Sequence, residues 1–260
     1  MEKYSLDQAL SEAEKMNTML KNGTAKNYSD ANSKVDTLNE QRKIWDRKWS
    51  KRKETAPATN FAKEVLSELK GEKMDLLDLG AGDGRDSILF AKNGHEVTAI
   101  DLSSEGINCL DEAGKKLGLK IHSIVGDIAT MELGENRFDV IYSNLGLHFF
   151  DKQTTKVIFD KLYSSLKSNG QLFISAKAKS DKFYGQGQKI SEDVYKFDGQ
   201  IRHFFSEEYT NELLAAFDQR NISTKYEPQT LEEGGTYDAA FIRAKATKSG
   251  VLKRDKGVRS

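Results

Sequence analysis

The sequence is poor in the features that would assign it to several common classes of protein. One cysteine, Cys109, in 260 residues excludes an intramolecular disulfide framework and a zinc site built from several cysteines. The 40 Lys and Arg residues balance the 40 Asp and Glu residues, so no net field recruits nucleic acid or a membrane surface. No apolar run has the length of a membrane helix, and residues 1–4 begin no signal peptide. We therefore expect a cytoplasmic protein that does not enter a membrane.

The most informative stretch is a short apolar run that ends near an acid and is followed by alternating glycines. Residues 76–79 (LLDL) predict a buried strand that includes Asp78. Gly80, Gly82 and Gly84 predict a sharp turn without a Cβ between the main chain and a ligand. The helix that follows has unpaired N–H groups at its start, which suit a carboxylate as well as a phosphate. The stretch thus predicts a ligand-binding loop.

Two classes of ligand compete for this loop. The dinucleotide fingerprint requires G-x-G-x-x-G, whereas the glycines here are spaced G-x-G-x-G and follow Asp78. A carboxylate at this position repels a pyrophosphate and favours a cationic group such as an ammonium. The motif D-x-G-x-G-x-G resembles the first motif of class I S-adenosylmethionine (SAM) methyltransferases, in which the loop surrounds the methionine part of the cofactor. A nicotinamide oxidoreductase is the competing interpretation, and it also needs a hydride-relay residue, for which we find no candidate.

Acids follow the next two predicted strands as well. The strand at residues 96–101 ends in Asp101, and a carboxylate there suits the paired hydroxyls of a ribose. NAD enzymes use the same device, so Asp101 does not separate the two ligand classes. The strand at residues 121–125 is followed by Asp127. In methyltransferases an acid here bonds the adenine amino group beside an apolar residue that covers the ring, and Asp127 and Ile128 match that pattern.

The order of the predicted elements extends the resemblance to residues 57–246. Strands and helices alternate between residues 75 and 217, and two strands follow. This resembles the methyltransferase fold: α/β, a doubly wound (Rossmann-like) seven-stranded, mostly parallel sheet whose last strand is antiparallel. Residues 77–91 and 143–150 look most like the tellurite-resistance type of methyltransferase and its small-molecule relatives. The resemblance implies SAM as cofactor and S-adenosylhomocysteine as product.

The resemblance also implies which residues bind the cofactor. Ser143, at the exit of the fourth strand (residues 138–144), would hold the methionine ammonium through its carbonyl group. Enzymes that methylate exocyclic nitrogens of bases often carry (Asp/Asn)-Pro-Pro-aromatic at this exit, and this chain has no proline there, which argues against base methylation. The full predicted set is Asp78, Gly80, Ala81, Gly82, Gly84, Arg85, Asp101, Leu102, Asp127, Ile128, Ser143, Asn144 and Leu145.

We predict three parts in the chain: a helical N-terminal extension or lid (1–55), a methyltransferase domain (56–246) and a basic tail (247–260). The extension should contain helices at residues 5–21 and 35–53 with a polar turn at residues 27–32. Seven cations on the second helix form a solvated face, steer an anionic substrate or touch RNA. The polar and aromatic stretch at residues 177–205 lacks strong periodicity, which is typical of a lid or binding loop.

Two histidines are the candidate general bases, should the methyl acceptor arrive protonated. His148 follows the fourth strand, and His203 stands beside Arg202 in the predicted lid. We expect a small-molecule acceptor, no metal ligands, and a monomer or homodimer. An RNA-directed methyltransferase that uses the basic helix, and a SAM-binding protein without turnover, are the alternatives that the sequence leaves open.

Overall fold

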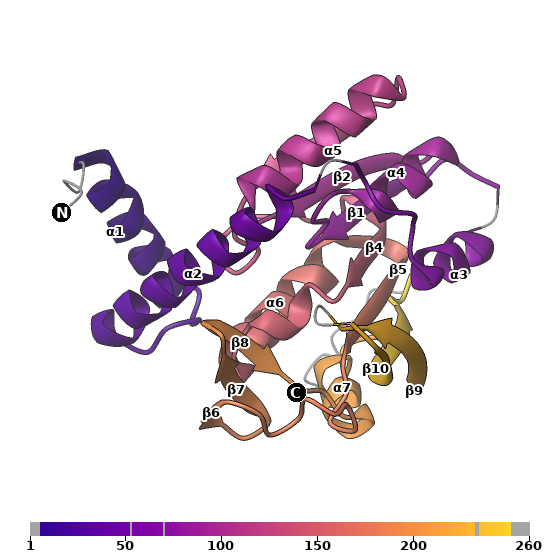
Figure 1. Ribbon diagram of the computed structural model, residues 1–260. Helices are drawn as coiled ribbons and strands as arrows, with labels where there is room; N and C mark the ends of the chain where they lie inside the picture. Colours follow the sequence, from indigo (N-terminus) through magenta and orange to yellow (C-terminus); the bar gives the residue numbers. More distant parts are fainter. Residues whose placement is uncertain (1–5, 53, 70, 232–233, 251–260) are drawn as a thin grey trace, which may run out of the picture.

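A seven-stranded sheet forms the centre of the protein (Figure 1). The computed structural model describes residues 6–52, 54–69, 71–231 and 234–250. The strand order is β3-β2-β1-β4-β5-β10-β9; the first five strands are parallel, and β10 runs antiparallel to both β5 and β9. The strands are β1 (Asp75–Leu79), β2 (Glu96–Asp101), β3 (Ile121–Val125), β4 (Phe138–Asn144), β5 (Leu166–Lys177), β9 (Gln219–Thr230) and β10 (Thr236–Thr247). This confirms the predicted fold.

Helices cover both faces of the sheet, because successive residues of a buried strand point to opposite sides. Leu76 packs with α3 (Asn60–Glu68) and α4 (Arg85–Lys92), and the adjacent Leu77 packs with α6 (Lys152–Ser165). The third helix of the first layer is α5 (Ser104–Lys116), and α7 (Glu207–Leu213) joins α6 in the second layer. Chain order reverses between β1 and β4, so the carboxyl ends of these strands flank a switch point of the sheet.

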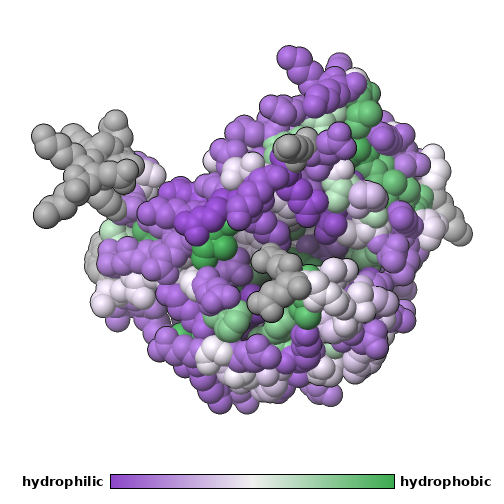
Figure 2. All heavy atoms as spheres, in the orientation of Figure 1, coloured by the Kyte–Doolittle hydropathy of each residue, from purple (hydrophilic) through white to green (hydrophobic). Residues whose placement is uncertain are grey.

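Two helices precede this domain, and the second crosses the carboxyl ends of the strands (Figure 1). They are α1 (Leu6–Lys21) and α2 (Tyr28–Trp49). The turn predicted at residues 27–32 is wrong: Asn27 is the N-cap of α2, and its side chain accepts a hydrogen bond from the Asp30 backbone N–H. The outer surface of α2 is a polar band across Figure 2, whereas Ala31, Val35 and Leu38 are buried beneath it.

The stretch at residues 177–205 is not the irregular loop that we predicted. It contains a three-stranded antiparallel sheet, namely β6 (Gln188–Ser191), β7 (Val194–Phe197) and β8 (Gln200–His203). Asp198 and Gly199 join β7 to β8 with φ angles of 50° and 77°, which is the Asp-Gly hairpin turn that keeps two strands in register. We call this small sheet the meander.

Other boundaries differ from the prediction by a few residues. The sequence predicts the third helix at residues 57–70, but the helix begins at Asn60, since the Thr59 hydroxyl caps it by accepting from the Ala62 N–H. The last helix, predicted at residues 207–217, ends at Leu213, and the last two strands, predicted at residues 222–227 and 237–244, are longer. No helix within the described ranges combines the length and apolar character needed to cross a bilayer. Of the predicted basic tail, residues 251–260 lie outside the described residues.

Candidate active site

The glycine loop lies where β1 meets α4, at the switch point of the sheet. Gly80, Gly82 and Gly84 have φ angles of 74°, 57° and 77°, a region that favours glycine. The backbone N–H groups of Gly80 and Ala81 both donate to the Ile100 carbonyl oxygen at the end of β2, at 2.8 and 3.1 Å. The neighbouring strand therefore fixes the loop before any ligand is present.

A side chain added at any of the three glycines would meet the protein itself. Glycine is therefore required here by packing, rather than by close approach of a ligand as the sequence suggested. A Cβ on Gly80 would lie 2.8 Å from the Cα of Gly146, and one on Gly82 would lie 2.7 Å from Cζ2 of Trp49. A Cβ on Gly84 would lie 2.2 Å from Cδ1 of Leu110. Close packing with the β4 exit, α2 and α5 thus requires glycine at these positions, and a ligand would approach another side of the loop.

Three buried carboxyl groups gather at adjacent strand ends: Asp78 in β1, Asp101 at the end of β2, and Asp127 after β3. Asp78 accepts a 2.6 Å hydrogen bond from the Ser87 hydroxyl. Asp101 accepts from the backbone N–H groups of Gly82 and Ser103, both at 2.8 Å. In the described part of the chain none of the three forms an ion pair with a cation.

Burial raises the pKa of each of these carboxyl groups. The pKa of Asp78 rises to about 8, because desolvation of its charged form outweighs the hydrogen bond from Ser87. Desolvation also raises the pKa of Asp101, against the two backbone hydrogen bonds, and that of Asp127, against bonds from the Ala129 N–H and the Thr130 hydroxyl. Each oxygen of Asp101 accepts one bond from the protein and retains a lone pair for a ligand donor.

Ile128 and the remaining predicted loop residues differ in how deeply they are buried. The Ile128 side chain is 6% exposed and belongs to the main core cluster with Ile100 and Leu133. Ala81 is also buried, whereas Arg85, the first residue of α4, and Leu102, directly after β2, are half-buried.

The exit of β4 is tied to the glycine loop and to the segment before α3. The Ser143 hydroxyl is fully buried and donates to the Leu79 carbonyl at 2.8 Å, and Leu145 turns the chain with a φ of 60°. Asn144 donates its side-chain amide to the Thr59 hydroxyl at 3.3 Å. The network centres on Asp86, which our sequence analysis missed.

Asp86 lies in the first turn of α4, and its carboxylate accepts from three groups at 2.8–2.9 Å: the N–H and hydroxyl of Thr59 and the hydroxyl of Tyr142. An acid in the first turn of a helix is the only local signal for it. Its partners are 27 and 56 residues away in sequence, so spacing alone does not reveal them.

The two candidate bases have different surroundings. His148 lies in the 3-10 helix η1 (Leu147–Phe149), is 5% exposed, and its Nδ1 has no hydrogen-bond partner among the described residues. Burial, reinforced by the charges of Lys177 and Arg202, holds its pKa well below the usual range. His203 is fully buried and its Nδ1 lies 3.1 Å from the Phe150 carbonyl oxygen; burial lowers its pKa to about 4. Both rings are therefore neutral at pH 7, and His203 holds β8 against the β4 exit.

Helix α2 closes over the glycine loop from the solvent side. Trp49 is 9% exposed and contacts Gly82 and Gly106, and Trp45 stacks on Trp49 and meets the Phe149 ring edge-on at a centroid distance of 5.0 Å. The Asp46 carboxylate accepts a 2.6 Å hydrogen bond from the Ser103 hydroxyl, next to Asp101. One helix thus bridges the segments that follow β2 and β4.

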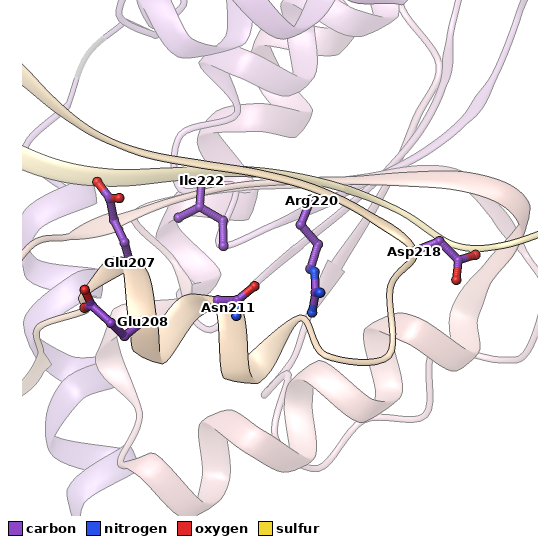
Figure 3. A pocket seen from close by; sticks show the side chains of 6 residues that line it. All are labelled: Glu207, Glu208, Asn211, Asp218, Arg220 and Ile222. Carbon is purple, nitrogen blue, oxygen red and sulfur yellow. The ribbon is translucent and has the colours of Figure 1, made fainter.

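Two hollows lie away from the strand ends. The first is a shallow depression between α7 and β9 (Figure 3), where Glu207 and Glu208 lie on the helix and Arg220 and Ile222 on the strand. The second is a groove between α4, α5, Arg52 and residues 54–58, where apolar side chains gather at the upper right of Figure 2. Of the predicted site residues, only Arg85 lines either hollow.

The sequence that builds these strand ends matches a known family. Residues 76–170 match the family model described as a methyltransferase domain, a span that includes the glycine loop, Asp101, Asp127 and the β4 exit. Residues 76–170 therefore belong to a class I SAM-dependent methyltransferase domain. This confirms the resemblance inferred from the motifs and removes the nicotinamide oxidoreductase from consideration.

Individual relatives agree with the family match. The chain is 32% identical over 124 residues to a phosphoethanolamine N-methyltransferase of Plasmodium falciparum (46% of each chain). It is 29% identical over 120 residues to the probable S-adenosyl-L-methionine-dependent methyltransferase TehB of Haemophilus influenzae (46% of this chain, 40% of TehB). These matches span less than half of each curated relative. The crystal structure of TehB superimposes with a TM-score of 0.60 at 21% identity and covers 79% of this chain and 67% of TehB.

Proposed function

We propose that the whole chain transfers a methyl group from SAM to a small-molecule acceptor. The observation that carries this proposal is the row of buried carboxyl groups, Asp78, Asp101 and Asp127, which have no cationic partner in the described structure. Buried acids of this kind are stabilised by a ligand that offers hydrogen-bond donors or a positive charge. SAM offers an ammonium, a ribose with two hydroxyls and an adenine amino group, one kind of donor for each acid.

Each part of the cofactor has a proposed partner on the protein. Asp78 and residues 80–84 face the methionine end, together with the Ser143 carbonyl. Asp101 uses its remaining lone pairs for the ribose hydroxyls. Asp127 receives the adenine amino group, and the neighbouring Ile128, which packs in the core, covers the ring.

The sulfonium of bound SAM supplies an already activated methyl group, so the protein contributes binding, alignment and electrostatics. The strand ends fix the position of the acids, and α2 excludes water from above through Trp45 and Trp49. His148 is neutral at pH 7 and its buried Nδ1 lacks a partner, so we propose it as the group that removes a proton from the acceptor. The buried and bonded state of His203 supports a positioning role instead.

Isothermal titration calorimetry tests the proposal most directly. We expect the full chain to bind SAM with a Kd in the micromolar range and to show no comparable binding of NADH. Asp101→Ala should remove most of the SAM affinity, whereas Asp160→Ala, a change of an exposed acid on α6, should leave it unaltered. Binding of NADH without binding of SAM would contradict the proposal. Methyl transfer from labelled SAM separates an enzyme from a SAM-binding protein without turnover.

An RNA acceptor is the second candidate, and the exposed cations of α2 favour it. Lys43, Arg47 and Lys48 are exposed on this helix, and Lys51 is exposed just after its end. RNA affinity should fall steeply with salt, while methylation of a small molecule should show little salt dependence. The cytoplasmic location and the monomeric or homodimeric state stay predictions from the sequence.

A further inference from the structure

A cluster of cations and aromatic rings lies beyond the β4 exit, on the side of the sheet edge away from the three acids. We define the cation–aromatic cluster as Lys177, Lys182, Phe183, Arg202 and Tyr237. These residues come from the end of β5, the segment after it, β8 and the start of β10. We propose that this cluster binds an anionic group, a carboxylate or a phosphate, on the methyl acceptor, with Arg202 as the residue that holds it. The inference rests on the proposed methyltransferase function and specifies its substrate class.

Arg202 is the central residue because its guanidinium is half-buried. Its Cζ lies 4.7 Å from the centroid of the Phe197 ring and 5.7 Å from that of Phe183. No carboxylate in the described part of the chain forms an ion pair with it; Asp198 and Asp181 contribute only longer-range attractions. A guanidinium has five N–H donors in a planar fork, and removing it from water is costly unless a partner accepts those bonds. Stacking on two rings fixes the plane of the fork and leaves its donors for a ligand.

Lys177, the other half-buried cation of the cluster, already has a carboxylate partner, so Arg202 provides the unbalanced charge. Lys177 Nζ lies 2.9 Å from the Asp181 carboxylate and 3.1 Å from the Tyr237 hydroxyl. Asp181 is itself fixed, because it also accepts from the backbone N–H groups of Phe183 and Ala240 at 3.1 and 3.0 Å. Lys182, which is exposed, lies 4.1 Å from the Tyr237 centroid and adds a further positive charge. Three cations thus surround one internal carboxylate.

The cluster has a fixed position relative to the proposed base. Residue 203 follows Arg202 on β8, and its Nδ1 contacts the carbonyl oxygen of Phe150, two residues after His148. Since neighbouring residues of a strand point to opposite faces, His203 enters the core while Arg202 points toward Phe183 and Phe197. The charges of both Lys177 and Arg202 act on the His148 ring. An acceptor anchored at Arg202 would therefore lie beside His148.

Aromatic rings lie next to the cation–aromatic cluster and next to His148. Phe183 and Tyr237 meet edge-on with centroids 5.4 Å apart, and Phe149 packs on the His148 ring at 4.1 Å. Flat aromatic rings next to one guanidinium without an ion-pair partner suit a small, largely apolar molecule that carries a single anionic group. Polycationic or neutral acceptors would leave the Arg202 charge uncompensated.

Binding of small probes to the full chain, saturated with S-adenosylhomocysteine, tests the proposal. We would titrate benzoate and phenyl phosphate as anionic probes and benzyl alcohol as the neutral one, and follow them by ligand-observed NMR. The anionic probes should bind roughly tenfold or more tightly than the alcohol, which is the range of one charge-assisted hydrogen-bond pair. Arg202→Gln should abolish that preference. Arg137→Gln, which changes an exposed arginine stacked on Phe138 at the opposite end of β4, should keep it.

SAM affinity is measured on the same protein preparations before S-adenosylhomocysteine is added, and it separates the possible failures. A wild-type protein that does not bind SAM would defeat the proposed function itself. Retained SAM affinity with equal binding of charged and neutral probes, or an unchanged preference in Arg202→Gln, would overturn the anionic-acceptor proposal alone. If Arg202→Gln does not fold, the wild type decides the question: labelled methyl from SAM should enter the fraction of a metabolite extract retained by an anion exchanger. Label found only in the unretained fraction would overturn the proposal.

Discussion

The two halves of the site differ in how their residues are brought together. In the cofactor half, the glycine loop with Asp101 and Asp127, the carboxylates bond to backbone N–H groups 2 to 19 residues away. In the acceptor half, η1 with the cation–aromatic cluster, the decisive contacts join residues 53 to 60 positions apart, as in His203 with Phe150 and Lys177 with Tyr237. Short-range contacts leave a recognisable spacing in the sequence, whereas long-range contacts do not. The proposed basis of substrate selectivity therefore lies in the half whose sequence is harder to interpret.

The largest predicted effect is a loss of catalytic rate without a loss of SAM affinity, which would distinguish the two halves. If His148 removes a proton from the acceptor, His148→Gln should lower kcat by about 100- to 10,000-fold. SAM affinity should not change, because His148 lies in the acceptor half. Because burial lowers the pKa of His148 well below its usual range, the ring is neutral at pH 7 and above, and its titration adds no acidic limb to the rate profile there. His122→Gln, at an exposed histidine on β3, is the matched control. A loss of less than about tenfold in kcat would assign His148 a packing role.

The two tryptophans of α2 contact different halves of the proposed site, which allows the halves to be compared within one helix. Trp49 packs on Gly82 in the cofactor half, while Trp45 meets Phe149 in the acceptor half. Trp49→Ala should lower the free energy of unfolding by about 3 kcal/mol, the low end for a buried aromatic, and should weaken SAM binding. Trp45 is half-buried, so Trp45→Ala should cost less stability and raise the KM for the acceptor. Chemical denaturation and calorimetry measure both, and identical effects of the two changes on SAM affinity would break the division.

Much of the fold follows from the sequence because local signals agree with the tertiary structure. The apolar runs at β1, β2, β3 and β4 end at Gly or polar residues, and their bounds were predicted almost to the residue. The turn at residues 27–32 failed because polar residues were given more weight than the Asn27–Asp30 capping pair. The meander was missed because its strands have four residues each, too few for periodicity, although Asp198-Gly199 was a usable hairpin signal.

A third prediction concerns Asp101, the carboxylate that we propose to bind the ribose hydroxyls of SAM. Asp101→Asn retains the size of the side chain but replaces one acceptor oxygen with an NH₂ group. Each hydrogen bond to a charged group contributes about 1.5–3 kcal/mol, so SAM affinity should fall roughly 10- to 100-fold. Selectivity for anionic probes should persist if the halves are independent. Calorimetric titration at constant ionic strength measures the loss, with Asp160→Asn as the matched exposed change.

A fourth effect depends on pH and arises at Asp78. Its pKa of about 8 means that the folded carboxyl holds a proton at pH 7, whereas the unfolded one releases it near its ordinary value of 3.8. The folded state thus binds more protons between these values, and the ligand-free protein should lose stability as the pH rises through that window. A nearby ammonium would expel the proton, so SAM affinity should rise from pH 6 to 8, by at most about tenfold per unit.

Calorimetry in buffers of different ionisation enthalpy measures the proton that is released on SAM binding. Asp78→Asn should bind SAM more weakly and release no proton. If the wild type releases none either, Asp78 does not face the ammonium, and its proposed role in the cofactor half is wrong.

The smallest predicted effect is on stability, and it concerns the two contacts that hold α2 against the meander. Lys196 on β7 forms a 2.8 Å ion pair with Glu40, whereas the buried Gln41 accepts a 3.1 Å hydrogen bond from the Ile201 N–H. An exposed ion pair contributes about 0–1 kcal/mol, and leaving a buried backbone N–H without its acceptor costs about 1–3 kcal/mol. Glu40→Gln should therefore change the free energy of unfolding by less than about 1 kcal/mol, and Gln41→Ala by more. If Glu40→Gln has the larger effect at 0.15 M salt, ion pairs rather than the buried contacts of α2 hold this helix over the site.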